Sequence, residues 1–311
     1  MTRPVFAICG SGFGLYGYLP ALTVWGRKVV LPRSYAPRVY ERPELAGLEQ
    51  NIVWAPDIDG ALAASAGVIV ALPPQQQAVV LERCLVLPNI KSILLEKPLA
   101  ADSASAVIAL EKLEKSRKRF EIGYSFLHTS WLKSLRPELI ASDYVSIEWH
   151  FMAHHFANNA STWKRRHSQG GGVLRFYGIH LLAVLAYWGY DTVQNSSIYE
   201  RVADEPETWN CVVVGPGLPP CRIHIDSRNS SPRFSVATAQ GGGLVDLVEP
   251  FGLEEPAAPF DARVPVLVRL LRQFDSGKPA LDEIYNRTNQ LWLETERGSP
   301  TPSGVADDQS I

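Results

Sequence analysis

The chain has 311 residues, a length that allows two domains of ordinary size, each with its own hydrophobic core. It carries 30 Lys and Arg against 32 Asp and Glu, a net charge of -2, so no field of one sign is available to hold nucleic acid or an anionic membrane, and we expect a small-molecule partner. Four cysteines without CxxC spacing, no apolar run of the ~20 residues that a membrane span needs, and an N-terminus without a signal-peptide core lead us to expect a cytoplasmic location.

Hydrophobic segments alternate with helical patterns over the first 122 residues. The hydrophobic segments are mostly continuous, as expected of strands that crossover helices cover on both faces. The predicted strands are 5–10, 28–32, 68–72, 92–97 and 119–124, and the predicted helices are 16–25, 76–87 and 103–116. This order predicts a Rossmann domain, a doubly wound parallel α/β sheet, over residues 1–122.

The chain changes character after Tyr124. Gly, Pro, Asn and Ser clusters separate short apolar segments, which indicates antiparallel strands. The predicted strands are 144–151, 210–215, 221–227 and 233–239, and the predicted helices are 173–188, 262–274 and 281–294. We therefore predict a second α+β domain with a mostly antiparallel sheet over 123–297, for substrate binding and oligomerisation, followed by a disordered tail over 298–311.

The first predicted strand ends in a glycine-rich turn, GSGFGLYG. Gly10 and Gly12 fall where the chain must turn sharply into a helix and let backbone amides approach a pyrophosphate. Gly14 lies one place before the usual third glycine, whose position is taken by Leu15. Because the turn follows a strand and opens a helix, it predicts a dinucleotide site. The expected contacts are Gly10, Gly12, Phe13, Gly14 and Leu15.

The end of the second predicted strand bears on which dinucleotide binds. A domain specific for NAD normally places Asp or Glu here, ~20 residues after the glycines, to bind the ribose 2′-hydroxyl. This chain reads LPRSYAPR, in which Arg33, Ser34 and Arg38 could accept a 2′-phosphate. The sequence therefore favours NADP over NAD, with solvated loop arginines as the alternative.

Further motifs carry a family resemblance. The fourth predicted strand leads into LLEKPLA (94–100), the third is followed by ALPP (71–74), and Trp163 precedes GGGVLRFYGIH (170–180). Together with GSGFGLYGYLPAL, these segments resemble the glucose-fructose oxidoreductase, inositol dehydrogenase and rhizopine-catabolism (Gfo/Idh/MocA) family. The resemblance implies an NAD(P)-dependent oxidoreductase in which Lys97 lies beside the nicotinamide and the substrate hydroxyl.

The resemblance also implies roles for neighbouring positions. Glu96 and Pro98 would shape the turn that carries Lys97, and Glu96 would contribute to the cofactor site. The loop of Leu72, Pro73 and Pro74 would run beneath the nicotinamide. Gln77, at a position often filled by His, would touch the ribose. Family members often associate through the open face of the second domain's sheet, which implies a homodimer or homotetramer.

The second glycine motif matches the family except at one position. The glycines 170–172, Gly178 and His180 agree, whereas Phe176 stands where the family has Asp. An Asp one helical turn before the His would fix its tautomer and raise its basicity, which Phe cannot do. Tyr177, at i-3 from His180, could instead supply a hydroxyl to a proton relay.

Lys97 and His180 also fit the chemistry without the family. Hydride transfer at a carbinol carbon needs a group that removes or donates the hydroxyl proton. Lys97 falls at the carboxyl end of a predicted strand, where open α/β sheets bind ligands, and partial burial would favour its neutral amine. The alternatives are a surface Lys before a proline and a core His on an apolar helix.

Other side chains are candidates for substrate contact. Trp163 and Lys164 begin a basic stretch, WKRRH, that could grip a phosphate or a nucleotide-sugar diphosphate, with solvated charges as the alternative. The expected substrate contacts are Tyr124, Trp163, Lys164, Tyr177 and His180. The histidines of the HFMAHH segment (150–155) have no acidic or cysteine partner close in sequence, so we predict no metal site there.

Three functions remain open on the sequence. The first is hydride transfer between nicotinamide and a sugar-like or nucleotide-sugar substrate in a biosynthetic pathway, with Lys97 and His180 handling the proton. The second is a cofactor-binding protein that has lost turnover and serves as a sensor or partner, which Phe176 favours. The third is imine or enamine reduction, which needs only one proton donor.

Overall fold

The computed structural model describes residues 5–132, 135, 141–238, 243–252, 259–276 and 282–298. The chain forms two compact units, unit 1 with residues 1–133 and 250–286, and unit 2 with residues 134–249 and 287–311. This division differs from the predicted domain boundaries, because 250–286 packs within unit 1. The predicted tail, apart from Gly298, lies outside the described residues. Within the described ranges, no helix is long and apolar enough to cross a membrane.

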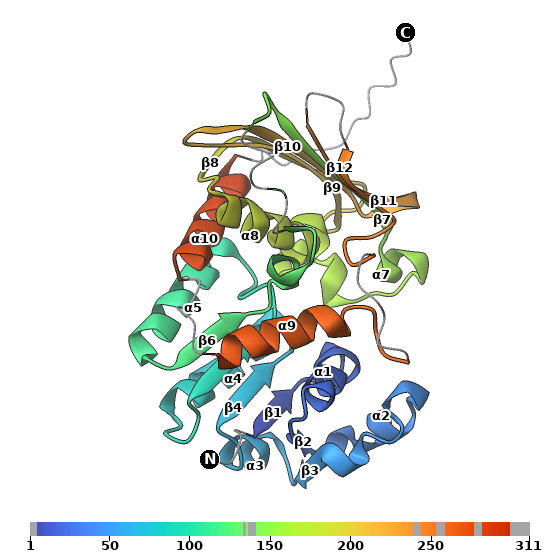
Figure 1. Cartoon of the computed structure of the whole chain (residues 1–311), viewed down its shortest axis with the longest axis vertical. Helices are drawn as coiled ribbons and strands as arrows, with labels where there is room; N and C mark the ends of the chain where they lie inside the picture. Colours follow the sequence, from blue (N-terminus) through green and yellow to red (C-terminus); the bar gives the residue numbers. More distant parts are fainter. Residues whose placement is uncertain are drawn as a thin grey trace. The chain divides into compact units, whose positions relative to one another are not determined.

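Unit 1 is built on a six-stranded parallel sheet in the order β3-β2-β1-β4-β5-β6 (Figure 1). Its strands are β1 (Phe6–Cys9), β2 (Val29–Pro32), β3 (Ile52–Ala55), β4 (Gly67–Val70), β5 (Ser92–Leu95) and β6 (Arg119–Ile122). Every residue of β1, β2, β4 and β5 is buried, which explains their continuous hydrophobic runs. The predicted Rossmann sheet is confirmed, and its strand order reverses between β1 and β4, where such sheets bind ligands.

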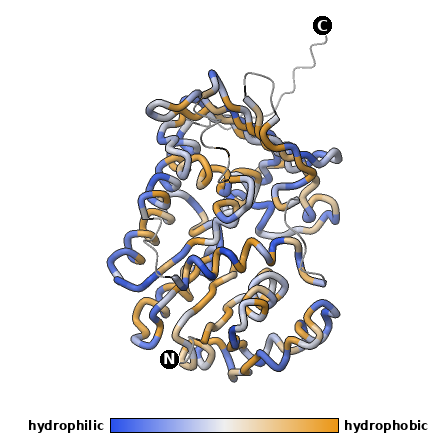
Figure 2. The backbone as a smooth tube through the Cα atoms, viewed as in Figure 1, coloured by the Kyte–Doolittle hydropathy of each residue, from blue (hydrophilic) through white to orange (hydrophobic). Residues whose placement is uncertain are grey.

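Helices flank this sheet. They are α1 (Leu19–Val24), α2 (Ala36–Tyr40), α3 (Ile58–Ala63), α4 (Pro74–Val86), α5 (Ser103–Ser116) and α9 (Val264–Asp275). Asp57 and Asp102 cap α3 and α5 by accepting hydrogen bonds from backbone amides, which satisfies donors that a helix start leaves open. α9 comes from distant sequence and packs on α1 (Figure 1), and its apolar residues join the core of unit 1. Figure 2 shows the hydrophobic residues gathered along the central strands of this sheet.

Unit 2 contains a second six-stranded sheet in the order β12-β11-β7-β10-β9-β8. Its strands are β7 (Val145–Met152), β8 (Thr192–Glu200), β9 (Pro206–Gly215), β10 (Leu218–Asp226), β11 (Arg228–Thr238) and β12 (Gly243–Leu247). Four of the five strand pairs are antiparallel, and the mostly antiparallel sheet is confirmed. The pair β7–β10 is parallel, which is consistent with a sheet that is mostly antiparallel. β7 lies between β10 and β11, two strands of opposite direction, so it must run parallel to one of them.

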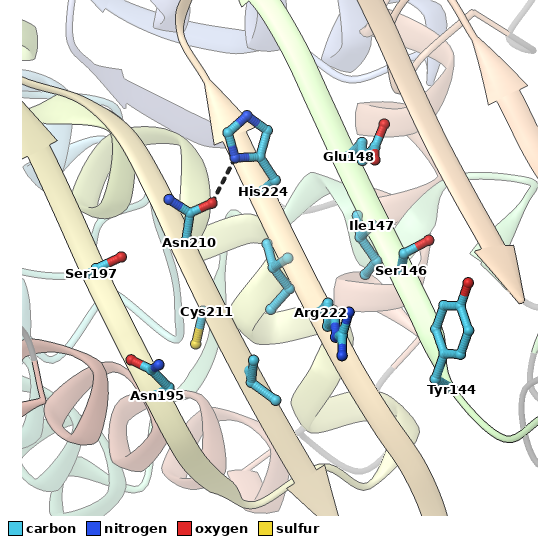
Figure 3. Close-up of a pocket in the computed structure, with 12 residues that line it drawn as sticks. Tyr144, Ser146, Ile147, Glu148, Asn195, Ser197, Asn210, Cys211, Arg222 and His224 are labelled. Atoms are coloured by element: carbon cyan, nitrogen blue, oxygen red, sulfur yellow. Dashed lines mark hydrogen bonds between the residues drawn. The ribbon is translucent and has the colours of Figure 1, made fainter. Parts of the chain in front are cut away.

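One face of the second sheet is covered and the other is open. The π-helical turn η9 (Val173–Gly178) packs on β9 and β10 and leads into α8 (Ile179–Trp188), in which all residues but Tyr187 are buried. The described residues also form α7 (His154–Ala157) and α10 (Asp282–Arg297), and the residues of α10 from 287 onward belong to unit 2. The open face forms a shallow pocket of about 450 Å³ that is lined by both polar and apolar residues (Figure 3). In it, His224 of β10 and Asn210 of β9 share a hydrogen bond of 2.7 Å.

Candidate functional site

Gly10 places the end of β1 directly against the end of β4. Its φ is +135°, and a Cβ at this position would lie 2.1 Å from the carbonyl oxygen of Ala71. The Ala71 amide donates a hydrogen bond of 2.7 Å to the Cys9 carbonyl. No residue but glycine fits here, since a side chain would meet both an unfavourable backbone conformation and a neighbouring backbone. The turn therefore begins at the point where the strand order reverses.

Gly12 and Gly14 serve different purposes in the turn. A Cβ at Gly12 would meet nothing within 4 Å, so this glycine faces open space, as a site for a close-approaching ligand requires. A Cβ at Gly14 would lie 2.7 Å from Cγ2 of Ile8 in β1. Gly14 thus permits the close helix–strand packing that the third glycine of a dinucleotide motif permits, one position early. This arrangement accounts for the imperfect spacing of the motif.

Leu15 lies inside the core rather than at the turn's surface. Its side chain is fully buried, and its amide donates to the Gly12 carbonyl at 2.9 Å. The side chain of Leu15 packs inside the core and its amide is bonded to Gly12, which argues against the predicted contact between Leu15 and the cofactor. The Phe13 ring lies under Arg263, with the guanidinium carbon 4.4 Å from the ring centroid.

The end of β2 brings basic side chains to the glycine turn. Arg33 and Ser34 are exposed in the turn after β2, and Arg38 follows in α2. The Arg38 guanidinium donates to Oγ of Ser11, between the first two glycines. The Tyr35 hydroxyl accepts a 2.9 Å hydrogen bond from the Gly10 amide. A cationic group thus lies on the turn itself, where an NAD-specific domain would place a carboxylate.

The loop after β4 is joined to the loop after β5 by Gln77. Leu72 and Pro73 are half-buried and Pro74 opens α4. Gln77 is 1% exposed, and its Nε2 donates to the carbonyl oxygens of Glu96 at 2.7 Å and Pro98 at 3.1 Å. Gln77 therefore holds the backbone around Lys97, which argues against the predicted contact with the ribose.

The loop after β5 places a buried carboxylate next to Lys97. Oε1 of Glu96 accepts a 2.5 Å hydrogen bond from the Tyr18 hydroxyl, and Oε2 accepts one of 3.2 Å from the Lys97 amide. Burial raises the pKa of Glu96, and the charge of Lys97, the Tyr18 hydrogen bond and Arg263 oppose that rise. Lys97 itself is half-buried. Unit 1 thus brings the glycine turn, the 71–74 loop and Lys97 to the carboxyl ends of its central strands.

Tyr18 and Arg263 are parts of this site that the sequence did not single out. Tyr18 is fully buried, and burial together with the Glu96 charge raises its pKa well above the usual range. Arg263 precedes α9 and pairs with Asp261 at 2.8 Å. Arg263 is 250 positions from Phe13, so no local pattern could have linked them. Tyr18 stands three residues after Leu15 on the helix that the motif opens, a signal that could have marked it.

Unit 2 carries an aromatic cluster around Phe176, the position at which the family resemblance implies an Asp. The Phe176 ring lies edge-on to Trp163 with centroids 5.3 Å apart, and the Lys164 amine lies 5.3 Å from its centroid. Tyr177 packs against Phe151 of β7 at a centroid distance of 4.6 Å. The cluster presents rings and a cation where a carboxylate would be expected from the resemblance.

The glycines of the second motif are required by packing. A Cβ at Gly171 would lie 2.2 Å from the Trp163 carbonyl oxygen, and one at Gly178 would lie 2.9 Å from the Trp209 ring. These glycines let the helix start approach the 163–164 backbone and the β9 surface. His180, the second residue of α8, is 6% exposed.

The predicted basic grip is largely neutralised within unit 2. Arg165 forms an ion pair with the buried carboxylate of Glu205, and Arg166 lies 3.4 Å from the same group. Two of the cations in the WKRRH stretch thus have an internal partner, a role that differs from both the predicted phosphate contact and the solvated-charge alternative. In unit 1, Tyr124 is fully buried, which argues against its predicted direct contact with substrate.

Across the described ranges, no group of three or more His, Cys, Asp and Glu could hold a metal ion.

The sequence matches no protein-family profile and no curated protein. Solved structures nevertheless share its fold at low sequence identity. GenD2 from gentamicin A biosynthesis, solved with NAD, is 16% identical with a TM-score of 0.70, and the match covers 96% of this chain and 95% of that chain. The WlbA dehydrogenase of Chromobacterium violaceum, solved with NADH and UDP-GlcNAcA, is 13% identical with a TM-score of 0.71 and 96% of each chain covered.

A third similar structure is KijD10, a 3-ketoreductase from Actinomadura kijaniata solved with NADP and TDP-benzene. It is 14% identical with a TM-score of 0.69, and the match covers 96% of this chain and 98% of that chain. These structural neighbours are oxidoreductases of the Gfo/Idh/MocA type, so the resemblance that the motifs indicate is confirmed at the level of the fold.

Proposed function

We propose that this chain is an NAD(P)-dependent oxidoreductase that transfers a hydride between nicotinamide and a sugar-like or nucleotide-linked sugar substrate. The observation that supports this most is the turn at Gly10 and Gly12, which follows β1 where the strand order reverses and leaves open space beside Gly12. Structural neighbours with the same fold were solved with NAD, NADH or NADP. The residues present therefore fit a dinucleotide, which would supply or accept the hydride when bound.

Lys97 is the proposed proton-transfer residue of unit 1. It follows β5 at the carboxyl edge of the sheet, half-buried, with its backbone held by Glu96 and Gln77. A positioned amine can donate a proton to a carbonyl oxygen or accept one from a hydroxyl. His180, buried on α8 in unit 2, is the second proposed proton-transfer residue, with Tyr177 close to it in sequence.

NADP is the proposed cofactor in preference to NAD. The support is Arg38, which contacts Ser11 on the glycine turn, together with the exposed Arg33 after β2. A guanidinium recognises phosphate oxygens through several donors at once, whereas a ribose 2′-hydroxyl is usually held by a carboxylate.

Unit 2 is the proposed substrate-binding part of the chain. Two similar structures were solved with nucleotide-linked ligands, UDP-GlcNAcA and TDP-benzene, which supports a nucleotide-linked sugar here. Phe176 favours the alternatives of a cofactor-binding protein without turnover or an imine or enamine reductase, because it removes the carboxylate that would orient His180. A biosynthetic pathway, a cytoplasmic location and a homodimer or homotetramer formed through the open sheet face belong to the same proposal.

The test compares cofactor binding with turnover. Nicotinamide fluorescence titrations with NADH and NADPH come first, followed by a screen of sugars and keto-sugars for a change in reduced-cofactor absorbance. We expect Lys97→Ala to lower turnover by at least ~100-fold, because a general acid or base is lost, with little effect on cofactor affinity. Lys115→Ala, at a lysine whose side chain is 76% exposed, is the matched control.

Two results would contradict the proposal. Tight cofactor binding with no turnover on any substrate would favour the sensor or partner alternative. A loss of turnover in Lys97→Ala no larger than in Lys115→Ala would reduce Lys97 to a structural role.

A further inference from the structure

The Tyr18 hydroxyl ties the helix after the glycine turn to the loop that carries Lys97. Tyr18 ends the π-helical turn η1 (Gly14–Tyr18), and its hydroxyl donates to Oε1 of Glu96 over 2.5 Å. Both side chains are buried, and 78 positions of sequence separate them. A short hydrogen bond from a hydroxyl to a carboxylate is among the stronger ones in proteins. The bond therefore fixes the Glu96 carboxylate relative to the end of the π-helical turn η1.

The surroundings hold this carboxylate in one place. A Cβ at Gly123, just after β6, would lie 2.6 Å from Oε1 of Glu96 and 3.1 Å from the Tyr18 hydroxyl, so the pair occupies space that a side chain would fill. The other carboxylate oxygen accepts from the Lys97 amide at 3.2 Å. Gln77 holds the carbonyl of Glu96 itself. Hydrogen bonds thus hold both carboxylate oxygens and the carbonyl oxygen of Glu96.

Charged groups act on Glu96 and on its hydrogen-bond partner Tyr18. Lys97 stands beside it, and Arg263, whose own partner is Asp261, acts from the segment before α9. Glu121 of β6 acts on Tyr18. Burial raises the pKa of Glu96, and the Tyr18 hydrogen bond is one of the interactions that oppose the rise. Removing that bond therefore raises the pKa of Glu96 further and favours the protonated carboxyl.

We propose that Tyr18 is a positioning residue for Lys97, acting through Glu96, whose place and negative charge it maintains beside the Lys97 amine. This inference rests on the proposed function, since it assumes that the protonation state of Lys97 matters for turnover. A Glu96 carboxylate that moves away from Lys97 or takes up a proton stabilises the ammonium form of Lys97 less. The amine then loses its proton at a lower pH.

A second buried tyrosine–carboxylate pair in unit 1 provides the matched control. The Tyr285 hydroxyl donates to Oε1 of Glu121 at 2.8 Å, and both side chains are buried. Glu121 is followed in β6 by Ile122 rather than by a lysine. Tyr285→Phe therefore removes a similar hydrogen bond at a similar depth without changing the group next to Lys97.

The experiment measures Lys97 ionisation directly and needs no turnover. The protein is acetylated briefly with limiting acetic anhydride over a range of pH, and peptide mass spectrometry compares Lys97 with the exposed Lys115 as an internal reference. In Tyr18→Phe, the midpoint of Lys97 labelling should move down, by at most about one pH unit, which is the shift expected when one nearby charge is lost completely. In Tyr285→Phe, the midpoint should stay within about 0.2 unit of the original protein.

Glu96→Gln provides a second route if Tyr18→Phe does not fold. It keeps the shape of the side chain, removes its charge, and should shift the Lys97 midpoint at least as far downward. Equal midpoints in the original protein and in the folded variant would overturn the inference, as would an equal shift in Tyr285→Phe. Where turnover is measurable, the limb of its pH profile that reports Lys97 should move in the same direction in Tyr18→Phe: the alkaline limb if the ammonium donates the proton, the acidic limb if the neutral amine accepts it. Absence of turnover or of cofactor binding in the original protein would instead contradict the proposed function, which separates the two failures.

Discussion

The two glycine-rich segments of this chain have the same local design, and they differ in that the first contains a glycine, Gly12, that faces open space. Each leads through a π-helical turn, η1 or η9, into an α-helix. In the first, Gly12 faces open space, because a methyl group added there would have no neighbour within 4 Å. In the second, Gly171 and Gly178 face a backbone carbonyl and an indole ring at 2.2 and 2.9 Å. The glycine content of a motif therefore does not show whether its glycines admit a ligand or a neighbouring part of the protein.

The largest effect, a loss of stability, is expected at Gly171. Gly171→Ala should lower the free energy of unfolding by roughly 3 kcal/mol, because the new methyl group would collide with the rigid backbone at Trp163 and Lys164. Urea denaturation followed by tryptophan fluorescence measures this change. Gly243→Ala is the control, since its added methyl group would meet nothing within 4 Å. Equal stability of the two variants would break the comparison.

The next effect concerns Gly12, where binding rather than stability should change. Gly12→Ala should weaken NADPH binding by about 30-fold, or about 2 kcal/mol, because its methyl group would enter the space that the pyrophosphate is proposed to occupy. The free energy of unfolding should change little. Fluorescence titration and urea denaturation of the same preparation separate the two quantities. A loss of stability without a loss of affinity would show that this glycine, too, is required by packing.

The smallest effect is expected at Arg38 and sharpens the account of the first segment. Arg38→Ala should weaken NADPH binding by about fivefold, or ~1 kcal/mol, and leave NADH binding unchanged, because only NADPH carries a 2′-phosphate for this exposed guanidinium to contact. Arg33→Ala, at the other basic position after β2, extends the test. Equal losses for the two cofactors would place Arg38 near the pyrophosphate instead.

Much of the fold could be predicted because the central strands have simple patterns. β1, β4 and β5 are buried along their whole length, so their hydrophobic runs are continuous. Two of the edge strands, β3 and β8, lack that signal. β3 has only one buried residue, Ala55, and β8 has only Ser196, and neither strand is among those predicted from the sequence. The parallel pairing of β7 and β10 could not be predicted either, since alternation along a strand does not specify the direction of its neighbour.

The candidate site also contains residues that the sequence predicts and residues that it does not. Motif positions such as Gly10 and Lys97 could be predicted because local turn chemistry and strand ends restrict them. The partners of these residues could not, because they come from far along the chain: Tyr18 meets Glu96 across 78 positions, and Arg263 reaches Phe13 from just before α9. The family resemblance implies a contact between Gln77 and the ribose, whereas the side-chain amide of Gln77 holds the Lys97 loop.

Amide hydrogen exchange with and without NADPH tests the central claim most directly. Binding at the turn after β1 should slow exchange in peptides that cover residues 10–18 and 92–100, because the cofactor would cover the glycine amides and the Lys97 loop. Peptides from the open sheet face, 144–148 and 218–226, should exchange at the same rate in both samples. Protection confined to that face, or no protection at saturating NADPH, would contradict the account.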